Sequence, residues 1–352
     1  MSGVIGHVMY AILGAKASAS RRLPIMSVIN HHYPSYLAGA YRGCDIQTMP
    51  SGINLKSGDP FGYGTLPSGV SELNGLPVKP WRFRFQYRDY TSKEVTDLFY
   101  GRSHLVLGWS ADDLALSLPW DHLPDYIGSV VEDSFELFGP GRRQLAYVLG
   151  WAAHVAGDAL IKDVRPGIEL ELLNGKYTPQ NRPIQDLIAF HEIGRNELHL
   201  NWESLLADLC ATPVEPIQPH YMRVTKRRGE LGERYPVAWA PEKHELLLKL
   251  LETNRWYLKL WIDQILEKLV LRSTPSGLQC HPELSATANG LSYLEMIELA
   301  ETANFRHALW QMGEEIADLF EAVVEITPRL QKLLESDLPS WTDITARWKT
   351  TK

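Results

Sequence analysis

Residues 149–160, "LGWAAHVAGDAL", carry an imidazole and a carboxylate inside a stretch that is otherwise small and apolar. His154 and Asp158 are four residues apart, so on a helix they lie one above the other on the same face. Burial of either group is unfavourable unless it is paired or bound to a metal ion. The stretch therefore predicts a buried helix whose polar pair is either hydrogen-bonded in the core or part of a metal site.

Helical periodicity extends in both directions from this stretch. No convincing Val, Ile or Thr alternation occurs, and the pattern predicts an all-α fold. Residues 47–92 are rich in Gly and Pro and lack periodicity, which predicts a long loop insertion, and its aromatic residues favour an ordered one. The predicted helices cover residues 4–20, 31–46, 92–109, 121–138, 142–164, 182–210, 242–271, 291–321 and 322–336.

We expect two parts that share one core. Residues 1–212 form a metal-binding helical domain that carries the insertion, and residues 213–352 add C-terminal helices. The helix predicted over 242–271 is apolar on more than one face, with Trp256 and Trp261 among its large side chains. Such a helix needs more than one partner surface, which favours packing on the same core.

Composition excludes several classes of protein. The net charge of −7 gives no footprint for a nucleic acid held by electrostatics. The three cysteines form no close pair, which argues against a thiolate zinc finger and a disulfide framework. No run approaches the roughly 18 apolar residues of a transmembrane segment, and the N-terminus has no basic start of a leader. These features predict a cytoplasmic protein.

Further imidazoles and carboxylates lie in apolar surroundings elsewhere in the chain. They are His7, Asp45, His104, His191 with Glu192, and His199. A single such histidine is typical of a hydrogen-bonded core residue, but several on different helices favour a shared metal site. Imidazole and carboxylate ligands suit zinc, iron or manganese.

The order of these groups is similar to that of a known family. A histidine in "VIGHVMYAILGAKA" is followed by "YLAGAYRGCDI", then "GRSHLVLGW", then the His-x-x-x-Asp helix "AAHVAGDAL". This order resembles the zinc-dependent phospholipase C family, whose all-α fold is shared with the S1/P1 nucleases and the catalytic domain of glycosylphosphatidylinositol-specific phospholipase D. The resemblance covers about residues 1–210. It implies a multi-helix phospholipase C/P1 nuclease-like bundle, here with a C-terminal helical extension.

The resemblance implies a metal-dependent hydrolase of phosphate esters. One zinc ion would be held by Asp45, His104, His154 and Asp158, and a second by His7 and the shared Asp158. Asp45 is also the family-like candidate for the general base. The substrate would be a small-molecule or lipid phosphate ester.

The chain departs from the family at the third metal site. "ALIKDVRPG" after Asp158 contains Lys162 and Asp163 but no histidine, and the N-terminal tryptophan of the family is missing. His191 is the best candidate for the later histidine ligand, but Arg195 stands one turn after it instead of an acid. Arg195 or Lys162 could instead stabilise phosphoryl charge. His199 and Glu203, four residues apart, are the alternative pair.

We therefore expect one or two zinc ions, with iron or manganese as alternatives. Two other functions stay open. The same site could serve other small-molecule chemistry, including iron-dependent chemistry, or the protein could be a non-catalytic, metal-stabilised helical scaffold for interactions.

Overall fold

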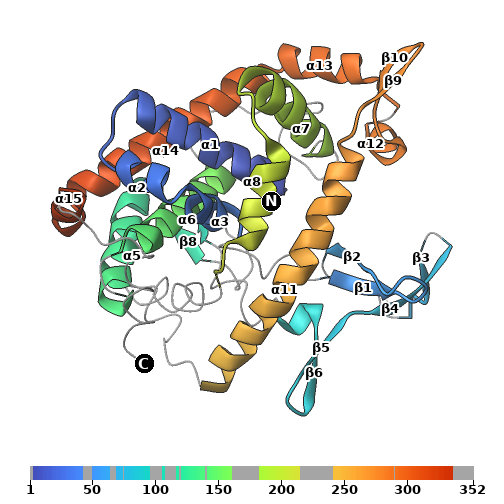
Figure 1. The fold of residues 1–352 in the computed structure, drawn as a ribbon, viewed down its shortest axis with the longest axis horizontal. Helices are drawn as coiled ribbons and strands as arrows, with labels where there is room; N and C mark the ends of the chain where they lie inside the picture. Colours follow the sequence, from blue (N-terminus) through green and yellow to red (C-terminus); the bar gives the residue numbers. More distant parts are fainter. Residues whose placement is uncertain are drawn as a thin grey trace.

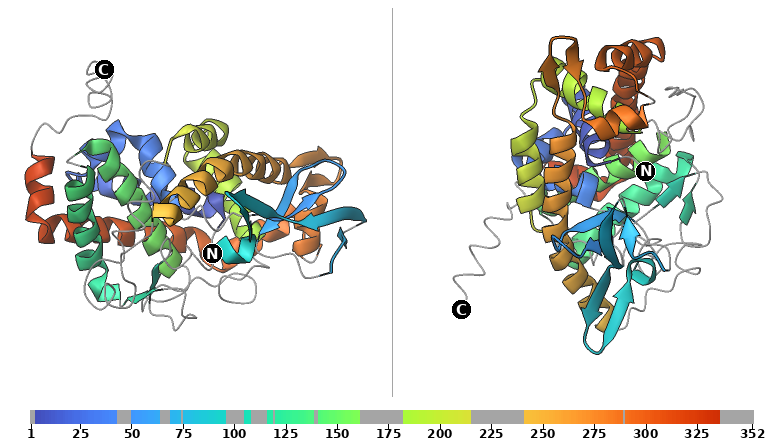
Figure 2. Two further views of the ribbon diagram at one scale, coloured as in Figure 1. Left: turned by 90° about the horizontal axis from the view of Figure 1, so that it is seen from below. Right: turned by 90° about the vertical axis from the view of Figure 1, so that its right-hand side faces the viewer.

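The computed structural model is mostly helical in the part of the chain that it describes, which confirms the predicted helical class (Figure 1). Short strands of residues 50–91 project at one side of the helical body (Figures 1 and 2). The described residues are 3–42, 50–63, 69–73, 75–95, 105–107, 116–118, 120–138, 141–160, 182–214, 241–288 and 290–335.

Helix α1 (Val4–Ser20) runs through the centre of the body, as the pattern over residues 4–20 predicted. Every side chain from Val4 to Ala15 is buried. A helix that is apolar on all sides needs neighbours on all sides. They include α3 (Tyr33–Arg42), α6 (Arg142–Leu160) and α14 (Phe305–Ile326), while α2 (Met26–His31) and α5 (Leu123–Phe138) extend the same core.

Helices α3 and α6 cross at unusually short range because each has a glycine at the crossing. A Cβ on Gly150 would lie 1.9 Å from the carbonyl oxygen of Tyr36, and a Cβ on Gly39 would lie 2.0 Å from that of Tyr147. Both neighbours are backbone atoms, so no side-chain movement could make room. This crossing determines where α6 presents His154 and Asp158.

The C-terminal helices pack on the same core as α1. Helix α14 lies along α1, and α13 (Tyr293–Thr302) contacts both α14 and α7 (Arg182–Ile188). The predicted helix over 291–321 is divided at Asn304, whose backbone is left-handed with φ of 53°. Helix α15 (Pro328–Leu334) follows α14 after Thr327, and α12 (Pro282–Thr287) follows the β9 (Arg272–Thr274) and β10 (Gly277–Gln279) hairpin.

The single helix predicted over 182–210 is three elements. After α7 the chain forms a π-helix, η3 (Ala189–Glu197), and then α8 (Trp202–Ala211). His199 has φ of 53°, which ends the helical run, and Asn201 caps α8 by accepting a hydrogen bond from the Ser204 amide. The apolar periodicity continues across this break, which is why the sequence pattern did not reveal it.

The described part of the predicted loop insertion contains six short strands. β1 (Pro50–Asn54), β2 (Pro60–Tyr63), β3 (Glu72–Leu73) and β4 (Leu76–Pro80) form one antiparallel sheet in the order β2-β1-β4-β3, and β5 (Arg82–Phe85) pairs with β6 (Arg88–Thr91). The frequent Gly and Pro residues obscure the two-residue period of such short strands.

One of two further strands lies where a helix was expected. β7 (Leu105–Leu107) pairs in parallel with β8 (Leu116–Leu118), so the prediction of one helix over 92–109 is wrong at its C-terminal end. Short apolar runs fit a helix or a strand equally well, and the pairing that selects the strand is not local.

The strands of the insertion pack on α11 (Pro241–Lys268) through a second, smaller core. Trp81 and Val95 meet a row of leucines on α11, and the Trp81 indole donates a hydrogen bond to the Tyr257 hydroxyl at 3.0 Å. This core attaches the strands to the helical body.

His32 predicts a pH dependence of stability. Burial, and then the nearby charges of His31, Arg143 and Arg142, lower the pKa of His32 to about 4. Because an unfolded histidine titrates near about 6.5, protonation favours the unfolded chain. The contribution of His32 is therefore full above pH 6.5 and is lost as the pH falls toward 4.

The free energy of unfolding of the parent should fall as the pH drops from 6.5 to 4. In a His32→Asn variant we expect this fall to be smaller by about 1–2 kcal/mol, a figure already reduced because His32 is partly exposed to solvent. Urea unfolding at pH 7.5 and 4.5 measures the difference. An equal loss of unfolding free energy between the two pH values in the parent and in the variant would contradict the assignment of this pH dependence to His32.

Candidate metal centre

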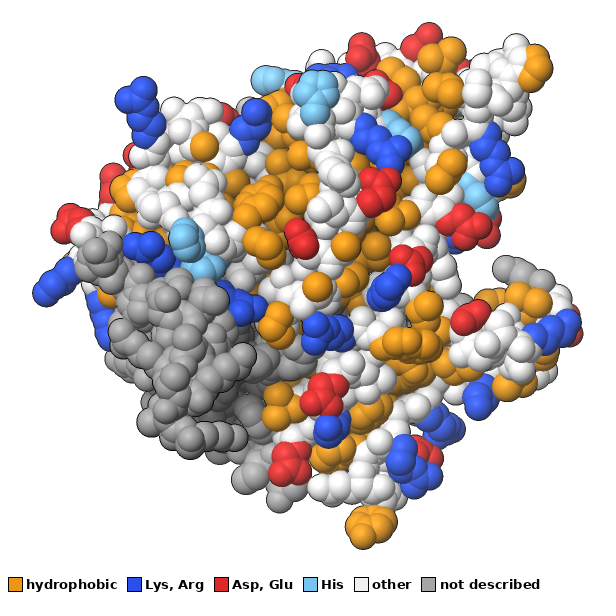
Figure 3. All heavy atoms as spheres, in the orientation of Figure 1, with side chains coloured by type: hydrophobic (Ala, Val, Ile, Leu, Met, Phe, Trp, Pro, Cys, Tyr) orange, Lys and Arg blue, Asp and Glu red, His pale blue; other side chains and the backbone are white. Residues whose placement is uncertain are grey.

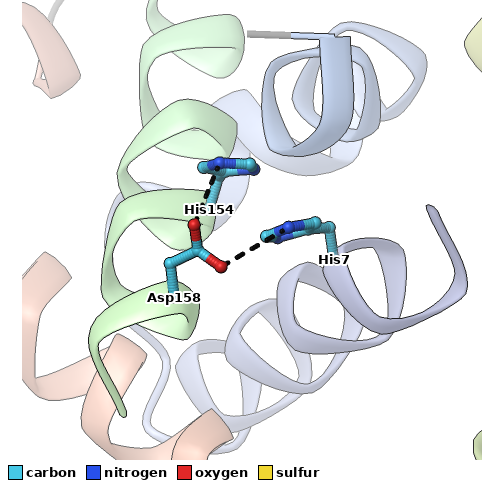
Figure 4. Close-up of side chains that lie close together, drawn as sticks. All are labelled: His7, His154 and Asp158. Atoms are coloured by element: carbon cyan, nitrogen blue, oxygen red, sulfur yellow. Dashed lines mark ion pairs between the residues drawn. The ribbon is translucent and has the colours of Figure 1, made fainter. Parts of the chain in front are cut away.

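Three buried side chains converge between α1 and α6 (Figure 4). His7 comes from α1, and His154 and Asp158 come from successive turns of α6. Each is at most 3 % exposed. One ligand atom from each lies within 4.8 Å of the other two, and among the described residues this is the group of His, Cys, Asp and Glu with that geometry.

The carboxylate of Asp158 lies between the two imidazoles. Its Oδ1 is 3.7 Å from Nε2 of His7, and its Oδ2 is 3.7 Å from Nε2 of His154. These separations exceed the roughly 2.7–3.2 Å of a direct hydrogen bond. They suit ligands that share one ion, since nitrogen and oxygen ligands each lie about 2.0–2.2 Å from zinc.

The backbone of α3 sets the tautomer of His154. Nδ1 of His154 lies 2.7 Å from the carbonyl oxygen of Ala40. A carbonyl can only accept, so Nδ1 carries the hydrogen and Nε2 of the neutral ring presents a lone pair to Asp158. A lone pair that faces a carboxylate is unfavourable unless a cation or a proton lies between them. A hydrogen bond from the second nitrogen to a backbone carbonyl is also the usual support of a metal-binding histidine.

The two imidazoles are stacked. Their centroids are 3.9 Å apart and their planes differ by 15°. Two stacked imidazolium ions would repel each other, so the arrangement disfavours a state in which both rings are protonated. The rings of Tyr10 and His7 meet edge to face, with their centroids 5.8 Å apart. Tyr10 also packs against Gly157, where an added Cβ would lie 2.4 Å from the Tyr10 ring.

Two of the predicted ligands, Asp45 and His104, lie outside the described residues, as do Lys162 and Asp163. The structure therefore brings together His7, His154 and Asp158 from the predicted set. The sequence pattern did not identify Ala40, because a supporting carbonyl has no side-chain signature. The small residues of "LAGA" (37–40) are the one signal of a close helix approach near it.

His191 is not part of this cluster. It lies on the π-helix η3, where its Nε2 is 2.6 Å from the carbonyl oxygen of Leu269 and therefore donates to it. Burial lowers the pKa of His191, although the hydrogen bond to Leu269 opposes the shift. The structure gives His191 the role of a core histidine that ties η3 to the end of α11.

The structure also places three other candidates away from this cluster: Arg195, His199 and Glu203. Arg195 forms an ion pair with Glu203 and lies over the ring of Phe190, 4.6 Å from its centroid. His199 is exposed and follows the end of η3. Among the described residues, the ligand atoms of His199 and Glu203 are not part of the group formed by His7, His154 and Asp158.

Comparison with family models, curated proteins and solved structures found no match to this chain. No described helix combines the length and apolar character that crossing a bilayer requires.

Proposed function

We propose that this protein is a metal-dependent hydrolase of phosphate esters whose metal site is built on His7, His154 and Asp158. The observation that carries the metal site is the position of the Asp158 carboxylate between two Nε2 atoms, one of which has its lone pair oriented by the Ala40 carbonyl. One or two zinc ions fit this donor set, and iron or manganese are the alternatives.

The chain's own residues would hold and orient the centre. Two imidazoles and one carboxylate leave coordination positions for water and substrate, as in catalytic sites with three protein ligands. When bound, the ion would polarise a phosphoryl oxygen and lower the pKa of a water ligand. By the resemblance, Asp45 would serve as general base, and Asp45 and His104 would add ligands.

The choice of phosphate esters rests on the order of the candidate ligands. His7, Asp45, His104, His154 and Asp158 follow one another in the same order as the ligands of the zinc-dependent phospholipase C family. A small-molecule or lipid phosphate ester is the substrate class that this order supports.

Elemental analysis of the purified protein tests the metal site. We expect about one or two divalent ions per chain, and loss of most of this metal in His154→Ala. The matched control is His191→Ala, which also removes a buried histidine but lies outside the cluster and should keep the metal. Equal metal content in parent and His154→Ala would contradict the proposal.

Hydrolysis is tested separately with bis-p-nitrophenyl phosphate and a lysophospholipid in the presence of zinc, manganese or iron. We expect turnover that Asp158→Asn abolishes. Metal binding without turnover of any ester would favour the second candidate, a metal-stabilised helical scaffold. The specific observation in its favour is the burial of all three ligands to 3 % exposure or less.

A further inference from the structure

The strands of the insertion form an arm that projects from the helical body. We call the described residues of 50–95 the β arm. In Figures 1 and 2 its sheet and its β5-β6 hairpin extend away from the helices, beyond the contact with α11. The inner face is closed by the core around Trp81, so the arm is held in a defined orientation.

Large apolar side chains are exposed in or beside three turns of the described β arm. Leu55 follows β1 and is 54 % exposed, Leu73 and Leu76 pair across the β3-β4 turn at 41 % and 42 %, and Tyr87 in the β5-β6 turn is 99 % exposed. Turns on a protein surface are ordinarily built from Gly, Asn, Asp, Ser and Pro. An apolar residue beside one turn would be unremarkable, but its occurrence at three separate turns of the described arm favours a surface that is covered in function.

Basic side chains accompany these apolar turns. Lys56, Lys79 and Arg82 are exposed and form no ion pair with any residue of the described chain. Arg84 and Arg88 are paired with Asp89 and Glu94. Residues 50–95 hold six basic and four acidic side chains, in a chain whose net charge is −7. Figure 3 shows the projecting region with hydrophobic side chains beside Lys and Arg.

We propose that the β arm docks on the surface of an anionic lipid bilayer, with Leu55, Leu73, Leu76 and Tyr87 entering the interface. The apolar residues stand in or beside separate turns and do not form one flat patch. A fluid bilayer adapts to separate projections, whereas a protein partner would need a matching depression for each. Leucine and tyrosine beside lysine and arginine are the composition that favours the interface of an anionic membrane.

This docking goes beyond the proposed hydrolysis, because it needs neither a metal ion nor turnover. It also does not depend on the identity of the substrate. Binding to vesicles can therefore succeed or fail independently of any activity measurement.

Cosedimentation of the full chain with vesicles tests the proposal. The vesicles are phosphatidylcholine alone, or phosphatidylcholine with about 30 % phosphatidylserine, which supplies the negative surface potential. We expect binding to the anionic vesicles to be at least about fivefold tighter, and to weaken at high salt. Tyr87→Ser combined with Leu76→Ser should lower binding about tenfold, and Lys56→Glu combined with Lys79→Glu by a similar factor or more.

The matched control is Leu294→Ser combined with Leu278→Ser. These leucines are 62 % and 43 % exposed and lie on α13 and β10, outside the β arm. The control should bind within about twofold of the parent. The single Tyr87→Ser variant, at a side chain that is almost fully exposed, removes no packing and provides a version of the test that cannot fail through unfolding.

Absence of binding to anionic vesicles at low salt would overturn the proposal. So would a control that loses as much binding as the variants of the β arm. A change of oligomeric state in the β arm variants without vesicle binding would show that the arm meets a second protein chain instead.

Discussion

Asp158→Asn is expected to lower metal affinity by more than about 100-fold and, at the same time, to leave the metal-free protein at least as stable as the metal-free parent. The first effect follows because the carboxylate lies 3.7 Å from both Nε2 atoms and is the one negative group of the cluster. The second follows because the introduced amide is neutral, which lowers the cost of burial, and can donate a hydrogen bond to an imidazole Nε2.

The two effects together separate a metal site from a buried hydrogen-bonded pair. If Asp158 served only to accept hydrogen bonds from protonated histidines, the substitution would destabilise the metal-free protein by several kcal/mol. Competition with a fluorescent zinc chelator gives the affinity, and thermal unfolding with and without a strong chelator gives the stabilities. A metal-free variant that melts well below the metal-free parent would count against the metal site.

Gly150→Ala is expected to destabilise the protein by about 2–4 kcal/mol. The added Cβ would lie 1.9 Å from the carbonyl oxygen of Tyr36 and 2.9 Å from the amide nitrogen of Ala40, so α3 and α6 must move apart. Movement of α3 also displaces the Ala40 carbonyl from His154, so metal affinity should fall about 10- to 100-fold, the range for loss of a supporting hydrogen bond.

The control for this prediction is Gly128→Ala on α5. Its Cβ would meet the hydroxyl of the Thr327 side chain at 2.6 Å, and its next nearest neighbours are side-chain atoms of Ile326 at 3.8 Å. The hydroxyl can rotate away, and the gain of about 1 kcal/mol in helix propensity offsets the adjustment. We expect a change within about 1 kcal/mol in urea unfolding and an unchanged metal affinity. Equal effects of the two substitutions would show that backbone contact at the α3-α6 crossing is not the determining factor.

The sequence alone determined the helical class and much of the cluster. The pattern over residues 4–20 predicted a helix, and α1 covers those residues. The i, i+4 spacing of His154 and Asp158 placed both on one face of a helix, which α6 shows. These features are local: an apolar period of 3.6 residues and a polar pair one turn apart depend on the backbone of one segment.

Only the tertiary structure decided which distant residues meet. His7 joins the cluster because α1 packs beside α6, whereas His191, with an equally suggestive sequence context, turns to the Leu269 carbonyl. The Ala40 carbonyl reaches His154 because Gly39 and Gly150 let two backbones approach. The strands of the β arm were hidden for a related reason, since their pairing and their packing on α11 are contacts between segments. A sequence pattern records the preferences of one segment, and close approach between segments is determined by the packing of all of them together.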